Sequence, residues 1–404
     1  MFFDHEAAER AVSWAEECRL QWAHEDSLEP SDAEIRDLLL KVVEHTVKDS
    51  TEKGRPVTLG LSAGYDSRPM LWALGELGLK ARTYTFGQIG NLDFDLARLL
   101  DDRNDLNNVF IDTSDVRWPL DAFVWAAAEG QDLPISPRVL AEQRLDDLFP
   151  DRIDLHGFLN GSLTGATQIQ KALDGGVHEQ SRAFMAKNDQ FGFQQLFDAR
   201  TLDALLLTGL PDVESPLSRY QKLDLGYRQF QRIRPLAGPS AKFRFPFEDE
   251  RWVGLWLSRD PGELRGQRRW IRFVRSLPRW LFFDLDVSDD CDRGMLRRQR
   301  IALVYGDEER PAMIESRSSG KHVPRNPTQH FCLQSCYRNN PSFRAFVSST
   351  IARLRSRRAL TDTFVSDILR DFENGDEEAV KGLNGLLTIE FVLEAGRIET
   401  IKAP

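Results

Sequence analysis

A short polar turn at residues 62–67 carries the residue types that bind phosphate groups. It follows an apolar run at residues 57–61 and opens into a helical pattern. In a strand–turn–helix unit, backbone N–H groups and the positive end of the helix dipole face the turn. Gly64 allows close approach of a ligand, and the hydroxyls of Ser62 and Ser67 can donate to phosphate oxygens. We therefore predict an anion site here.

Asp66 indicates which kind of ligand this turn could bind. A carboxylate repels phosphate unless it holds a cation such as Mg²⁺ that bridges phosphate oxygens. We therefore expect Asp66 to be a Mg²⁺ ligand beside a nucleotide phosphate. The turn has no lysine, so it differs from a Gly-x-x-x-x-Gly-Lys-Ser loop. The alternative is an ordinary turn in which Asp66 and Ser67 only cap the following helix.

The elements that must position this turn predict an α/β fold with a parallel sheet. Short β-type runs alternate with helical patterns, as in strands joined by crossover helices. Helical patterns also dominate both ends of the chain, and Ser31 offers an N-cap near the start. The expected strands are 57–61, 81–86, 108–112 and 153–157, with helices at 68–79 and 93–100. The expected units are a helical N-terminal segment (1–54), the sheet domain (55–283) and a turn-rich, then helical, C-terminal region (284–404).

Composition favours a globular cytoplasmic protein. The chain has 404 residues, of which 41% are hydrophobic, so it can bury a large core. The formal net charge is −10, which makes nucleic-acid binding unlikely as a general property. We expect no membrane contact, because no run approaches the ~20 apolar residues of a membrane helix. The four cysteines do not suggest a disulfide scaffold, and the acidic N-terminus does not resemble a signal peptide.

Residues 61–68 (Leu-Ser-Ala-Gly-Tyr-Asp-Ser-Arg) resemble the Ser-Gly-Gly-x-Asp-Ser loop of the asparagine synthetase family. Residues 244–249 (Arg-Phe-Pro-Phe-Glu-Asp) are similar to the Arg-x-Pro-Phe-x-Asp segment of the same family. The segments between them that match in order are 85–87, Asp93 with Ala97, and 110–112. The resemblance covers roughly residues 32–283.

The resemblance implies a doubly wound sheet of the adenine nucleotide alpha hydrolase-like type. It also implies an ATP pyrophosphatase reaction, in which a carboxylate becomes an acyl-adenylate, pyrophosphate leaves, and ammonia or an amine forms the amide. The implied cofactors are ATP and Mg²⁺. The implied nucleotide-binding positions are Leu61, Ser62, Gly64, Asp66, Ser67, Phe86 and Gly87. Asp66 is also the implied metal ligand and a catalytic residue, and Lys321 is the best match for a catalytic lysine that neutralises the α-phosphate.

The sequence departs from the family pattern at two places, and each affects the expected amide-forming activity. Phe2 stands where a glutaminase domain needs a cysteine, so we expect free ammonia, an amine substrate or a separate amidotransferase partner. The stretch 155–165 matches the second metal segment of the family but has no aspartate, and Asn160 or Ser162 takes its place. A neutral oxygen holds Mg²⁺ less well than a carboxylate. A non-catalytic nucleotide-binding or assembly protein is therefore one alternative.

A second alternative is an ATP pyrophosphatase that modifies tRNA. The predicted helix at residues 264–277 carries five arginines, which could contact RNA. We instead expect a solvated basic face on a helix whose apolar stripe is buried. The five arginines are Arg265, Arg268, Arg269, Arg272 and Arg275.

Overall fold

The computed structural model describes most of the sheet domain and both helical ends of the chain. The described residues are 5–22, 29–62, 64–87, 92–113, 137–166, 175–188, 217–234, 242–284, 299–300, 302–304 and 340–402, with single residues at 120, 123, 124, 127, 333, 337 and 338.

A five-stranded sheet, parallel at every pairing, forms the centre of the molecule. Its strands are β1 (Val57–Gly60), β2 (Ala81–Gly87), β3 (Val109–Asp112), β4 (Ile153–Leu155) and β5 (Phe243–Arg244). The order across the sheet is β3-β2-β1-β4-β5. The prediction of an α/β fold with a parallel sheet is therefore confirmed, and the first four strands lie where the sequence pattern placed them. Strands inside a parallel sheet are covered on both faces, and β1 and β4 at its centre are accordingly almost fully buried.

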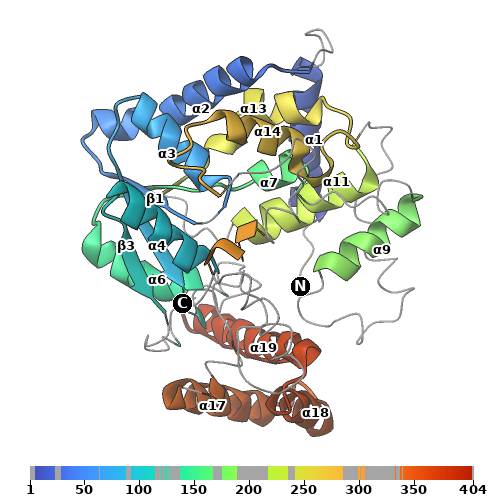
Figure 1. Ribbon diagram of the computed structural model, residues 1–404. Helices are drawn as coiled ribbons and strands as arrows, with labels where there is room; N and C mark the ends of the chain where they lie inside the picture. The colour runs from blue at the N-terminus through green and yellow to red at the C-terminus, as the bar shows by residue number, and fades with distance from the viewer. Residues whose placement is uncertain are drawn as a thin grey trace.

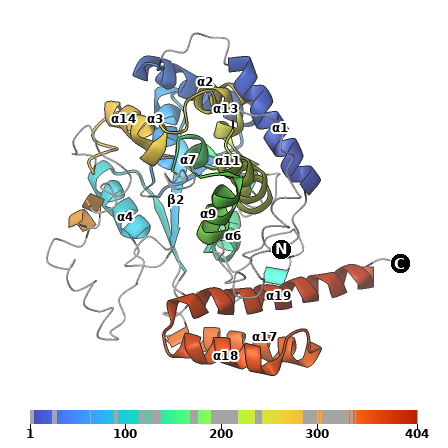
Figure 2. The ribbon, with the colours of Figure 1, turned by 90° about the vertical axis from the view of Figure 1, so that its right-hand side faces the viewer.

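Helices cover both faces of this sheet. The crossovers are α3 (Ser67–Glu76), α4 (Leu92–Asn104) and α6 (Pro137–Leu148). On one face, Val57 and Leu59 pack in the core that includes α3. On the other face, Tyr84 packs with Leu145 of α6. Figure 2 shows α4 and α6 on opposite sides of β2. The chain therefore winds in both directions from β1.

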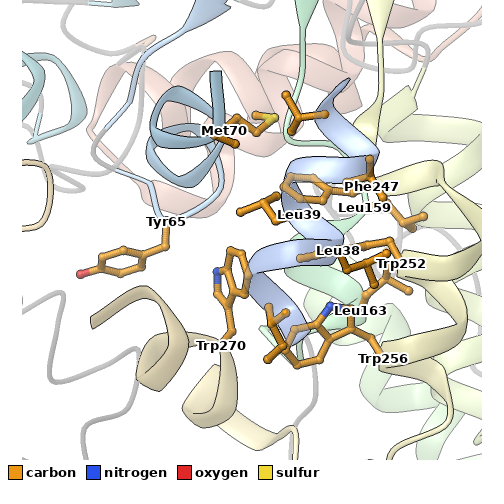
Figure 3. Close-up of a cluster of buried hydrophobic side chains, with 14 of the residues drawn as sticks. Leu38, Leu39, Tyr65, Met70, Leu159, Leu163, Phe247, Trp252, Trp256 and Trp270 are labelled. Carbon is orange, nitrogen blue, oxygen red and sulfur yellow. The ribbon is translucent and has the colours of Figure 1, made fainter. Parts of the chain in front are cut away.

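The N-terminal helices complete the main core. They are α1 (His5–Trp22) and α2 (Asp32–Glu52), and Ser31 caps α2 in a capping box with Glu34, as its position predicted. Figure 1 shows α2 lying along the same side of the sheet as α3, α13 and α14. Figure 3 shows Leu38 and Leu39 of α2 packed among Phe247 and three tryptophans.

Shorter elements surround the carboxyl ends of β4 and β5. They are α7 (Asn160–Leu163), α9 (Val177–Asn188), α11 (Arg219–Leu223), a π-helix η2 (Asp224–Ile233), the 3₁₀ turns η3 (Pro246–Glu248) and η4 (Arg265–Gln267), α13 (Glu250–Leu257) and α14 (Arg268–Ser276). π-Helices are rare and often lie at functional sites. Here η2 packs against α1 and α7.

Three C-terminal helices form a layer apart from the sheet in both views (Figures 1 and 2). They are α17 (Pro341–Arg357), α18 (Asp362–Glu373) and α19 (Glu377–Lys402), with their own core that includes Phe346 and Phe391. A break separates α18, which ends at Glu373, from α19, which begins at Glu377. A second break follows α17, where Arg358 adopts a left-handed conformation. No helix in the described part of the chain is long and apolar enough to cross a membrane.

Candidate active site

The loops after β1 and β4 meet at the point where the strand order reverses. The chain passes from β1 to β2 and β3 on one side, and places β4 and β5 on the other. In open α/β sheets, ligands bind at the carboxyl ends of the strands beside such a switch point. The 62–67 turn follows β1, and the Gly-rich stretch from Gly157 follows β4. The two segments that the sequence singled out therefore lie at one location.

Hydrogen bonds from its two serines close the 62–67 turn on itself. The Ser62 N–H donates to Ser67 Oγ at 3.3 Å, and the two hydroxyl oxygens are 3.4 Å apart. The Gly64 N–H donates to Ser62 Oγ at 3.0 Å. A Cβ on Gly64 would lie 2.8 Å from Ser62 Oγ, so a side chain there would push the Ser62 hydroxyl out of its present position. Ala63 lies outside the described residues.

The other predicted nucleotide-binding positions lie at the ends of β1 and β2. Leu61 is buried, and its carbonyl accepts from the Thr85 hydroxyl at 2.6 Å. Phe86 is half-buried and stacks on Tyr84. Gly87 has a φ of 149°, a conformation that favours glycine, and its carbonyl accepts from the Thr113 N–H. These positions share the edge of the sheet that carries the 62–67 turn, and their contacts are also those of ordinary core packing.

Asp66 does not cap α3 with its side chain. It occupies the N-cap position but has helical angles (φ −102°, ψ −43°) and makes no side-chain capping hydrogen bond. Its Oδ1 instead accepts from Nδ2 of Asn160 at 2.7 Å. Gly157 makes this approach possible, because a Cβ there would lie 2.8 Å from the Asp66 Cβ. The alternative interpretation, in which Asp66 is only a helix cap, does not describe this side chain.

Asn160 is fixed on its other side by Trp252. The indole Nε1–H of Trp252 donates to Asn160 Oδ1 at 3.0 Å, and both side chains are fully buried. An indole N–H is only a donor, so the carbonyl oxygen of Asn160 faces Trp252 and its NH₂ faces Asp66. The sequence suggested that the Asn160 oxygen replaces a metal-binding carboxylate. The structure instead directs that oxygen away from Asp66.

The second motif, at residues 244–249, supports Trp252. Pro246 and Phe247 form η3, and Asp249 then caps α13 by accepting from the Arg251 N–H. Burial raises the pKa of Asp249, but hydrogen bonds and charge from Arg251 outweigh it and leave that pKa below its ordinary value. Trp252 follows in the first turn of α13 and packs on Phe247. The two motifs therefore meet through Asn160.

Ser162, the other residue considered in place of the aspartate, is also engaged. Its hydroxyl donates to Asp224, the first residue of η2. Asp224 is buried and also accepts from Arg228 at 3.2 Å and from Gln229 at 3.4 Å. A carboxylate thus contacts the Gly-rich segment from another element. Sequence reasoning missed Asp224, and a lone aspartate in a helical pattern gave no signal of this role.

The donor set at the turn suits Mg²⁺ held mainly by phosphate oxygens. Within the described ranges, no three His, Cys, Asp or Glu side chains gather to form a metal site by themselves. Mg²⁺ in phosphoryl-transfer sites typically uses one or two carboxylates, with phosphates and water as the remaining ligands. Asp66 fits that role, because its carboxylate is directed to the switch point and is not used for capping.

Two further predictions have different outcomes. Lys321 lies outside the described residues. On α14 the apolar stripe is buried as expected, but Arg269 is also buried and pairs with Glu29 and Asp32. Arg272, which is exposed, is 3.2 Å from Glu29. Glu29, which precedes α2, and Asp32, its first residue, therefore neutralise part of this basic run.

Comparison with known proteins adds no assignment. The chain matches no protein-family model, and no match was found among curated proteins.

Proposed function

We propose that this chain is an ATP-dependent amide-forming enzyme of the asparagine synthetase type, with a fold of the adenine nucleotide alpha hydrolase-like kind. The observation that carries the proposal is the orientation of Asp66. Its carboxylate is withdrawn from helix capping and held by Asn160 at the switch point of the sheet. The strand order β3-β2-β1-β4-β5, typical of doubly wound nucleotide-binding sheets, supports the same location.

The reaction follows from the chemistry of carboxylates. A substrate carboxylate oxygen attacks the α-phosphorus of ATP, the bond to the bridging oxygen breaks, and pyrophosphate leaves. Ammonia or an amine then attacks the acyl carbon, loses a proton, and expels AMP. The chain's own groups bind and orient: the two serine hydroxyls, and backbone N–H groups of the turn other than those of Ser62 and Gly64, would hold the phosphates. Mg²⁺, when bound at Asp66, would offset the phosphate charge.

The substrates are a small carboxylic acid and either ammonia or an amine. A separate amidotransferase is the expected partner if ammonia comes from glutamine. The test is pyrophosphate release from ATP and Mg²⁺ with panels of acids and amines, compared with tRNA. Release that depends on a small acid supports the proposal. Release stimulated by tRNA and by no acid would replace it with tRNA modification.

A non-catalytic nucleotide-binding protein is the second candidate, and one observation favours it. The residue opposite Asp66 presents an amide NH₂ where a second carboxylate would bind metal. One carboxylate holds Mg²⁺ less firmly than two. ATP that raises the melting temperature in Mg²⁺, with no pyrophosphate release for any acid, would support this candidate.

A further inference from the structure

Two arginine side chains lie over the ring of Tyr65, a residue of the 62–67 turn, and both bind Asp284. We call Arg68, Asp284 and Arg300 the guanidinium clamp. Arg68 donates from Nη1 and Nη2 to the two Asp284 oxygens at 2.6 and 3.0 Å, and Arg300 Nε donates to Asp284 Oδ2 at 2.9 Å. The Arg68 guanidinium lies 5.0 Å from the centre of the Tyr65 ring, and that of Arg300 lies 3.9 Å from it. In Figure 3 the Tyr65 ring points away from the tryptophan cluster.

The clamp also holds the backbone of the turn. Arg68 Nε donates to the Gly64 carbonyl at 3.1 Å. The Gly64–Tyr65 peptide is planar and trans, so its N–H points opposite to its C=O. The Tyr65 N–H is therefore directed away from Arg68. Arg68 thus sets the direction of one backbone donor in the turn that we assign to phosphate.

Counted over the described residues alone, the charges of the clamp do not cancel. Arg68 and Asp284 are both buried and neutralise one another, and Arg300 adds one net positive charge. A buried ion pair needs no third charged member to be balanced. An extra cation over the ring of Tyr65, a residue of the turn that we assign to phosphate, would lower the energy of a bound phosphate, because burial reduces screening.

We propose that the guanidinium clamp positions the phosphate turn and that Arg300 supplies charge which favours the bound triphosphate. This inference rests on the proposed ATP site and adds a positioning residue to it. It also links the turn to the chain after residue 284, through Arg300. The sequence analysis assigned no role to Arg68, Asp284 or Arg300, whose contacts form only in the folded chain.

Arg300→Met is the test variant, because it leaves the Arg68–Asp284 pair intact. Arg103→Met is the matched control. Arg103 lies 4.2 Å from the centre of the Phe283 ring, so the substitution removes the same charge and the same kind of contact elsewhere. Arg300→Lys tests rescue, since it keeps the charge. The measurement is calorimetric affinity for MgATP and for inorganic pyrophosphate, at two salt concentrations.

The expected result is binding about tenfold weaker in Arg300→Met for both ligands, the order of one charge interaction. Arg300→Lys should recover most of it, and the loss should shrink at high salt. Arg103→Met should bind as the unaltered chain does. Unchanged affinity in Arg300→Met would overturn the clamp alone. An unaltered chain that binds neither ligand would overturn the ATP site and the clamp together. If the chain binds MgATP but releases no pyrophosphate, the proposed enzymatic activity is wrong, and the affinities of the variants still decide whether the clamp supports the bound phosphates.

Discussion

The hydrogen bond from Trp252 to Asn160 can be isolated, because the same cluster contains a tryptophan without one. Trp252 and Trp256 are both fully buried, on the same helix, with ring centres 6.0 Å apart. Trp252 Nε1 donates to Asn160 Oδ1. Trp256 Nε1 is buried and has no hydrogen-bond partner among the described residues. Replacing either by phenylalanine removes similar apolar volume, so that cost largely cancels in the comparison.

The two variants should differ in unfolding free energy because only one of them leaves the Asn160 Oδ1 without its donor. Trp252→Phe leaves Asn160 Oδ1 buried without its donor, which costs about 1–3 kcal/mol. Trp256→Phe leaves no acceptor unsatisfied and removes a buried N–H that has no partner. We therefore expect Trp252→Phe to lose about 1–3 kcal/mol more stability than Trp256→Phe. Urea unfolding measures both. Because Asn160 also loses its fixed orientation, MgATP affinity should fall in Trp252→Phe only.

Equal losses of unfolding free energy in the two variants would refute this reasoning. They would mean that the indole hydrogen bond does not orient Asn160, and that the link between the two sequence motifs is packing alone.

Three other predictions follow from the same contacts. Asn160→Asp places a second carboxylate 2.7 Å from Asp66, so the unfolding free energy should fall by about 2–4 kcal/mol without metal and recover in millimolar Mg²⁺. The control Asn104→Asp should show no dependence of stability on Mg²⁺. If the stability of Asn160→Asp does not depend on Mg²⁺, the proposed metal site is wrong. Burial raises the pKa of Asp284, but the charges and hydrogen bonds of Arg68, then Arg300, outweigh it and lower that pKa from 3.8 to about 2. A carboxyl whose pKa is lower in the folded state stabilises the fold at pH values above its pKa in the unfolded state. About 2 kcal/mol of unfolding free energy should therefore be lost as the pH falls from 3.8 towards 2. The difference in unfolding free energy between the unaltered chain and Asp284→Asn should become smaller over this pH range. A constant difference would contradict the lowered pKa of Asp284. Gly157→Ala should abolish MgATP binding, since its Cβ would lie 2.8 Å from the Asp66 Cβ; Gly75→Ala, which meets nothing within 4 Å, is the control.

The sequence predicted the sheet well because its strands are short runs of β-type residues separated by helical patterns. The run at 57–61 predicted the buried strand β1 from local information alone, and the small-residue turn after it is the basis of the proposed anion site. The capping box at Ser31 is equally local. These features depend on residues within a few positions of one another, which a sequence displays directly.

The contacts that define the site were not predictable in the same way. Asp66 meets Asn160 and Asn160 meets Trp252 across separations of 94 and 92 residues. The same asparagine could offer oxygen or NH₂ to Asp66, and only the buried indole decides which. The clamp joins Arg68 to Asp284 across 216 residues, so its charge balance is likewise a property of the folded chain.

The most direct test of the central claim is pyrophosphate release by Asp66→Asn. Asparagine can still accept from Asn160, so the unfolding free energy should change little, but the charge that would hold Mg²⁺ is lost. We expect release to fall about a hundredfold or more, while Asp260→Asn, the same charge change at an exposed turn, keeps full activity. Full pyrophosphate release by Asp66→Asn would contradict the assignment of this turn to Mg²⁺ and the phosphates of ATP.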